Sequence, residues 1–140
     1  MRNKSISAMQ HCLVFVTAVT LAASTLAAWP AWAADAAKEA ATAAQHAGLA
    51  AQATIIDTVH AHLHHTVNCL VGPKGEGFDA KQMNPCDGMG SGAIPDTADA
   101  VKKKTLSDGL QKAMAGLASN DLTEAKKDAA ESAAALKGAM

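Results

Sequence analysis

The sequence predicts an all-α protein, an antiparallel bundle of three to four helices with one long, disulfide-tethered loop rich in glycine and proline. Between residues 35 and 71 there is no proline and a single glycine, while alanine is abundant, a composition typical of helix. Large apolar residues recur at helical spacing within 49–70 and again within 106–117. Each helix would therefore bury one face against a partner, as in a bundle.

Residues 1–33 have the features of a secretory signal peptide. Arg2 and Lys4 precede an apolar run, and Ala-Trp-Ala at positions 31–33 is a small-x-small cleavage pattern. The apolar run is shorter than the roughly 20 residues that a membrane-spanning helix needs. We therefore expect a periplasmic or secreted protein, in which residues 34–140 form a single α-helical domain without a membrane span.

Few side chains of the expected mature protein suit nucleic-acid binding. Loss of Phe15, Trp29 and Trp32 with the leader would leave Phe78 as the one remaining Phe, Tyr or Trp. Stacking on bases or sugars needs such rings. Loss of basic leader residues would also make the formal net charge of −1 more negative, which disfavours contact with phosphates. These features argue against a nucleic-acid partner.

The segment 35–71 is predicted to be one long helix, or two helices broken near Gly48, and it ends at the helix-stop pair Gly72-Pro73. Its second half carries a narrow apolar stripe. The stripe consists of Leu49, Ile56, Val59, Leu63, Val67 and Leu70.

Residues 72–96 hold six glycines and three prolines and show no regular period, so we expect a loop. Cys69 and Cys86 are the two cysteines after the leader, and an even pair in an exported protein predicts a disulfide. Closing this loop would contribute about 3 kcal/mol to stability in the chain-entropy model. We expect Phe78 to be at least half buried near Leu70, where it would organise the loop.

The C-terminal third is predicted to form the remaining helices. A helix would begin near Asp96, with a kink near Thr105 to reconcile its apolar residues with the stripe at 106–117. Asp121-Leu122-Thr123-Glu124 has the pattern of a capping box and would open the last helix. The face of that helix directed to the core would contain Leu122, Ala125, Ala129, Ala133 and Leu136.

Four histidines within six residues are the strongest chemical signal in the chain. His60 and His64 are one turn apart on the same helix face, the spacing by which a helix offers two imidazoles to one metal. His62 would lie near the opposite margin of the apolar stripe, and His65 would point outward. On a continuous helix, His46 would lie about 21 Å from His60, too far to share an ion with it.

One helix would supply two ligands, whereas zinc sites use three or four from the protein. The loop offers the carboxylates of Asp79 and Asp87 and the thioethers of Met83 and Met89 as auxiliary ligands. Alternatively, a second subunit could supply the same histidines in a homodimer. Methionine with histidine would favour copper, while histidine with carboxylate would suit zinc or nickel.

An alanine- and histidine-rich helix behind a signal peptide, containing His46, His60, His62, His64 and His65, resembles the small periplasmic histidine-rich metal-binding proteins. Those proteins are helical bundles that bind several divalent ions. The resemblance covers the leader and residues 35–71. The segment after residue 96 lacks histidine, and the cysteine-closed loop is foreign to that family.

The sequence therefore predicts an exported helical protein that binds copper, zinc or nickel through His60 and His64, with the other histidines as auxiliary ligands, for sequestration or delivery. One alternative is an interaction protein whose histidine face is solvated or responds to acid. Another is a b-type haem electron carrier. No serine, histidine and acid arrangement is recognisable, so we do not expect an enzyme.

Overall fold

The computed structural model describes residues 34–140, and within them it contains five helices and no strand. The prediction of an all-α protein is confirmed for this part of the chain. The expected leader and its cleavage position lie outside the described residues. The helices are α1 (Ala36–Gln52), α2 (Ile56–Val71), α3 (Ala93–Asp96), α4 (Ala100–Ala118) and α5 (Leu122–Gly138).

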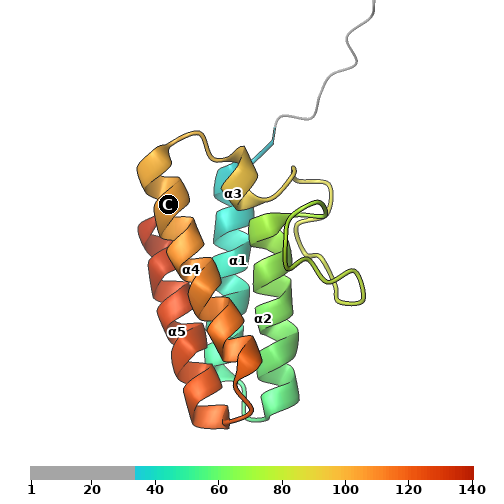
Figure 1. Ribbon diagram of the computed structural model, residues 1–140, viewed down its shortest axis with the longest axis vertical. Helices are drawn as coiled ribbons and strands as arrows, with labels where there is room; N and C mark the ends of the chain where they lie inside the picture. The colour runs from blue at the N-terminus through green and yellow to red at the C-terminus, as the bar shows by residue number, and fades with distance from the viewer. Residues whose placement is uncertain (1–33) are drawn as a thin grey trace, which may run out of the picture.

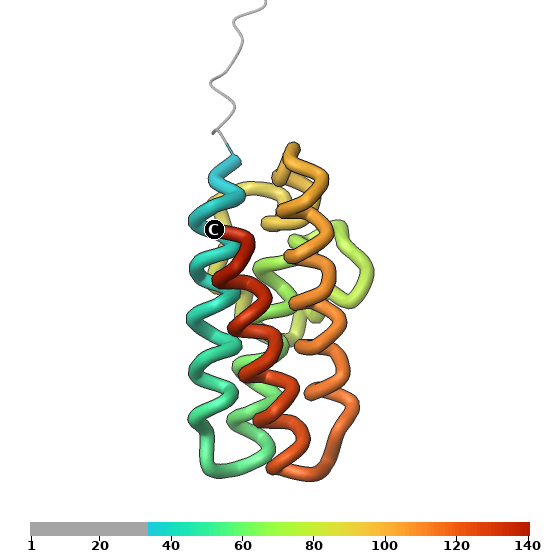
Figure 2. Tube along the Cα trace, turned by 90° about the vertical axis from the view of Figure 1, so that its left-hand side faces the viewer, coloured from blue at the N-terminus to red at the C-terminus, as the bar shows by residue number. Residues whose placement is uncertain are grey.

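The four longer helices lie side by side (Figures 1 and 2). α1 packs against α2 and α5, and α4 packs against the same two helices from the other side. The short α3 contacts α1, α2 and α4 at one end of the molecule. None of the helices within residues 34–140 is both long enough and apolar enough to cross a membrane.

The break in the N-terminal helical segment lies at residues 53–55, between α1 and α2. Gly48, where a break was expected, lies inside α1. Ala53 and Ile55 adopt extended backbone conformations that end one helix and precede the next. No strong stop residue marks this position; the reversal lets the alanine face of α1 cover the apolar face of α2.

Small side chains bring α1 and α2 close together. Ala43 and Ala47 of α1 are fully buried, and the Thr66 hydroxyl of α2 donates a hydrogen bond to the backbone oxygen of Ala43 over 3.3 Å. The predicted stripe on α2 is largely confirmed, although Leu49 of α1 is 40% exposed. Its buried members are Val59, Leu63, Val67 and Leu70.

The prediction that residues 72–96 are irregular throughout is wrong, because they contain the short helix α3. The disulfide between Cys69 and Cys86 is confirmed, with a Cα–Cα distance of 5.2 Å. Phe78 is half-buried and packs against the core. Buried Asn68 anchors the loop by accepting from the Asp79 amide over 2.9 Å and donating to nearby loop carbonyls.

Two further expectations about α4 are wrong. The helix begins after Asp99, whose side chain accepts hydrogen bonds from two amides of the first turn, whereas Asp96 ends α3 and accepts from the Ser91 amide instead. α4 also continues through Thr105 as a single helix, because the Thr105 hydroxyl donates to the Val101 backbone oxygen one turn earlier and does not cap a new helix. The predicted start of α5 at Asp121 is confirmed by a side-chain hydrogen bond to the Glu124 amide.

Candidate metal centre

The reversal between α1 and α2 brings three histidines together. His46 comes from α1, while His62 and His65 come from adjacent turns of α2. One ligand atom from each ring lies within 4.8 Å of the others, and all three side chains are half-buried. We call these residues the histidine triad; among the histidines, cysteines and carboxylates of residues 34–140, it is the group whose spacing suits a metal ion.

The rings of the triad are in direct contact. Nδ1 of His46 and Nδ1 of His62 are 3.2 Å apart and share a hydrogen bond, so one ring donates and the other accepts. The His65 ring meets the His46 ring edge to face, with centroids 5.0 Å apart, and its distance to the His62 ring is 5.7 Å. The packing therefore directs three imidazoles at a common point between two helices.

The surroundings keep His46 and His65 uncharged. Burial, together with the neighbouring His65 and His62, lowers the pKa of His46 to about 4. Burial also lowers the pKa of His65, with His62 and His64 contributing in the same direction. Since a neutral imidazole is the form that binds metals, two of the triad's rings are held in the ligand form at neutral pH.

A nitrogen of the triad lacks a hydrogen-bond partner. Nδ1 of His65 is buried and makes no hydrogen bond to the described residues. A buried polar atom without a partner costs free energy, typically 1–3 kcal/mol. An ion at the centre of the triad is one kind of partner that would relieve this cost.

The spacing of one nitrogen pair matches that of two ligands on a single ion. Two imidazole nitrogens bound tetrahedrally at the usual zinc–nitrogen distance would be about 3.3 Å apart. The two Nδ1 atoms of His46 and His62 are 3.2 Å apart. Metal binding would thus replace the shared proton between these rings with the ion.

The pair favoured by the spacing argument lies elsewhere. Nε2 of His60 donates a hydrogen bond to the backbone oxygen of Ser119 over 2.9 Å. Nδ1 of His64 lies 3.7 Å from a carboxylate oxygen of Asp79 in the loop. His60 and His64 therefore have separate partners, and neither belongs to the triad.

The predicted separation of His46 from the other histidines holds only for a continuous helix, whereas the chain reverses at residues 53–55. In a hairpin of two helices, residues equally distant from the turn lie opposite each other. His46 and His62 are each eight residues from Thr54. This symmetry, combined with the i, i+3 spacing of His62 and His65, is the signal that could have located the site.

The loop residues predicted as auxiliary metal ligands do not come together at one site. Asp79 lies beside His64, Asp87 is exposed, and neither carboxylate joins the triad. Met83 is 65% exposed, whereas Met89 packs against the core. The cysteine sulfurs are joined in the disulfide, which excludes them as thiolate ligands.

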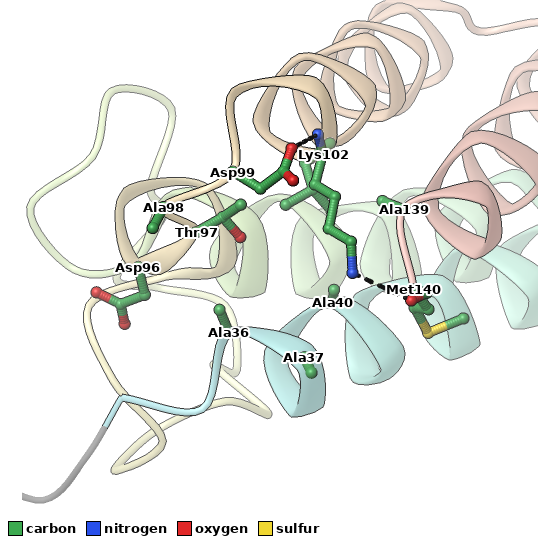
Figure 3. Close-up of a pocket in the computed structure, with 11 residues that line it drawn as sticks. Ala36, Ala37, Ala40, Asp96, Thr97, Ala98, Asp99, Lys102, Ala139 and Met140 are labelled. Atoms are coloured by element: carbon green, nitrogen blue, oxygen red, sulfur yellow. Dashed lines mark hydrogen bonds between the residues drawn. The ribbon is translucent and has the colours of Figure 1, made fainter.

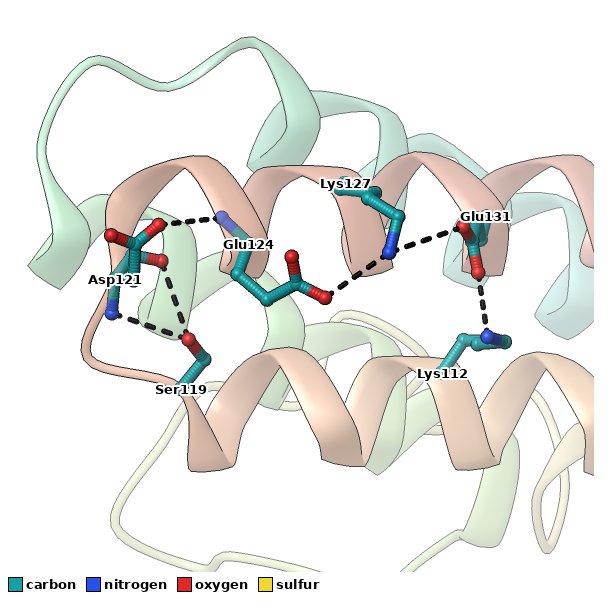
Figure 4. Close-up of polar contacts among 6 residues, drawn as sticks. All are labelled: Lys112, Ser119, Asp121, Glu124, Lys127 and Glu131. Carbon is teal, nitrogen blue, oxygen red and sulfur yellow. Dashed lines mark hydrogen bonds and ion pairs between the residues drawn. The ribbon is translucent and has the colours of Figure 1, made fainter.

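Other polar features of the structure have structural explanations. Figure 3 shows a pocket where α1, α4 and the end of α5 meet; it is lined largely by alanine, and Lys102 crosses it to the Met140 backbone oxygen over 3.3 Å. Figure 4 shows an exposed network in which Lys112 joins α4 to Glu131 of α5 over 2.6 Å. Among the described residues, neither site holds three histidines, cysteines or carboxylates at metal-ligand spacing.

Comparison of the chain with known protein-family models, with curated proteins and with solved structures found no match.

Proposed function

We propose that this protein binds one late transition metal ion, copper, zinc or nickel, through His46, His62 and His65. The observation that carries this proposal is the convergence of one ligand atom from each ring within 4.8 Å. Imidazole suits all three metals, and the low pKa of His46 keeps that ring available as a ligand. This ligand set replaces His60 and His64 as the principal pair.

The setting that we propose for the site is an exported, antiparallel bundle of four helices with a disulfide-tethered loop. The leader pattern at 1–33 supports a periplasmic or secreted location, where disulfides persist. The resemblance to periplasmic histidine-rich metal-binding proteins supports a role in metal sequestration or delivery rather than catalysis. Elemental analysis of protein purified from its native compartment identifies the metal.

Calorimetric titration of the purified protein with Cu²⁺, Zn²⁺ and Ni²⁺ tests the proposal. We expect one tight site per chain that is abolished by His46→Ala, His62→Ala or His65→Ala. The matched controls are His60→Ala and His64→Ala, which remove an imidazole from the same helix but should leave the tight site in place.

Two results would contradict the proposal. Affinity no tighter than millimolar for every ion would exclude a specific site. Equal, weak losses for all five substitutions would indicate a solvated histidine surface, as expected of an interaction protein.

A further inference from the structure

The triad supplies three ligands, one fewer than a closed tetrahedral site requires. The remaining histidines of the described chain contact other groups, His60 at Ser119 and His64 near Asp79. The cysteines are bonded to each other. Within residues 34–140, no further histidine, cysteine or carboxylate is grouped with the triad, so a metal bound there would keep a vacant position.

The triad lies at the edge of the seam between α1 and α2 rather than in the core. Each of its rings is half-buried, whereas the apolar residues inside the seam, such as Ala47, Val59 and Leu63, are fully buried. Nδ1 of His65 is itself buried, but each side chain of the triad keeps part of its surface in solvent. The site is therefore within reach of water and of small incoming ligands at this edge of the seam.

The charge of the ligand set indicates which incoming ligand would bind best. Three neutral imidazoles leave the charge of a divalent ion uncompensated, because no carboxylate or thiolate belongs to the group. An anionic donor at the vacant position would gain the Coulomb attraction that the protein itself does not supply.

We propose that the metal held by the triad accepts a small anionic donor at its vacant position and leaves the protein by associative ligand exchange. In this step a lone pair of the donor forms a bond to the ion as water departs, and the imidazole nitrogens then dissociate in turn. No electron is transferred. This inference depends on the proposed function and assigns the site to metal delivery rather than sequestration.

The experiment uses protein loaded with Cu²⁺ and titrated with azide, followed by electron paramagnetic resonance and by the azide-to-copper charge-transfer absorption. We expect a saturable azide adduct in the wild type. In a second measurement, the rate of copper transfer to a chromogenic chelator should rise in proportion to chelator concentration.

Asp79→Asn and His64→Ala are the matched controls, because His64 adjoins the triad residue His65 in sequence and Asp79 lies 3.7 Å from the His64 ring. Both variants should form the adduct as the wild type does. An adduct that appears only in one of these variants would mean that the removed side chain closes the site, and the inference would be overturned.

A wild type that binds one Cu²⁺ but forms no adduct, with a transfer rate independent of chelator concentration, would also overturn the inference while leaving the proposed function intact. Failure to bind Cu²⁺, Zn²⁺ or Ni²⁺ at all would instead overturn the proposed function together with it.

Discussion

Glu39 is the most unusual single residue outside the triad. Its side chain is 1% exposed; Oε1 accepts a hydrogen bond from the Gly92 amide over 3.1 Å, and Oε2 has no partner among the described residues. Burial, with smaller contributions from the negative charges of Asp96 and Asp35, raises the pKa of Glu39 to about 7. This carboxyl group joins α1 to the end of the loop and is protonated below about pH 7.

The raised pKa predicts that stability falls as pH rises. The unfolded chain loses this proton near pH 4.5 but the folded protein keeps it to about pH 7, so the stabilisation is complete below pH 4.5 and is lost through pH 7. The expected loss is on the order of 3 kcal/mol. Denaturant unfolding of the His46→Gln variant between pH 4 and 9 measures it, because this variant lacks the opposing contribution of His46 over the same pH range. Adding Glu39→Gln should remove the dependence, and an unchanged profile in the double variant would refute the assignment.

The lowered pKa of His46 contributes the opposite pH dependence to the stability of the metal-free protein. Its pKa falls from 6.5 in the unfolded chain to about 4 in the folded protein, so the unfolded state takes up a proton first as pH falls. Stability should therefore be full above pH 6.5 and decline towards pH 4. Unfolding curves recorded with a chelator present test this. The Glu39 and His46 contributions oppose each other over much of the same pH range. Glu39→Gln should therefore make the decline towards pH 4 steeper, and His46→Gln should remove it.

At the scale of the helices, close packing depends on residues without side chains. A Cβ atom added to Gly109 of α4 would lie 2.6 Å from Cδ2 and 2.9 Å from Cγ of buried Leu136. The Ser132 hydroxyl of α5 also donates to the Gly109 backbone oxygen over 2.8 Å. The weakly apolar face of α4 thus packs well because α5 approaches its backbone.

A matched pair of glycine substitutions tests this view. Gly109→Ala should destabilise the protein by about 1–2 kcal/mol, because overpacking against Leu136 exceeds the gain in helix propensity. Gly48→Ala should stabilise it by about 0.5–1 kcal/mol, since a Cβ atom there meets nothing within 4 Å. Both glycines lie inside helices, so thermal unfolding of the two variants separates packing from propensity. Equal effects would contradict the packing argument.

At the scale of the whole molecule, the disulfide and the histidine triad lie in different parts of the structure. The bond joins the last turn of α2 to the loop, whereas the triad lies between α1 and α2. Replacing both Cys69 and Cys86 with alanine should cost about 3 kcal/mol of stability but leave metal stoichiometry unchanged. Thermal unfolding and metal titration of this double variant check the two expectations. Loss of the metal site at temperatures where the variant remains folded would show that the loop helps to position the triad.

Local chemistry made several features predictable from sequence. Helix composition, the Asp121 cap and the stripe on α2 depend on neighbours within a few residues, and all are present. The Cys69–Cys86 pair was predictable because residues 34–140 contain two cysteines, which allow one intramolecular bond. These interactions are settled by residue type and spacing, and they require no knowledge of how the helices pack.

The position of the turn and the membership of the histidine triad were decided by tertiary structure. No glycine or proline marks residues 53–55; the chain reverses there because α1 and α2 bury apolar faces against each other. That reversal places His46 beside His62, while the contact with Ser119 occupies His60. By itself, the sequence determined that the chain is helical, closed by one disulfide and rich in imidazole. Which imidazoles meet depended on contacts between segments distant in sequence, because helical periodicity orders residues along one helix but does not set its partner.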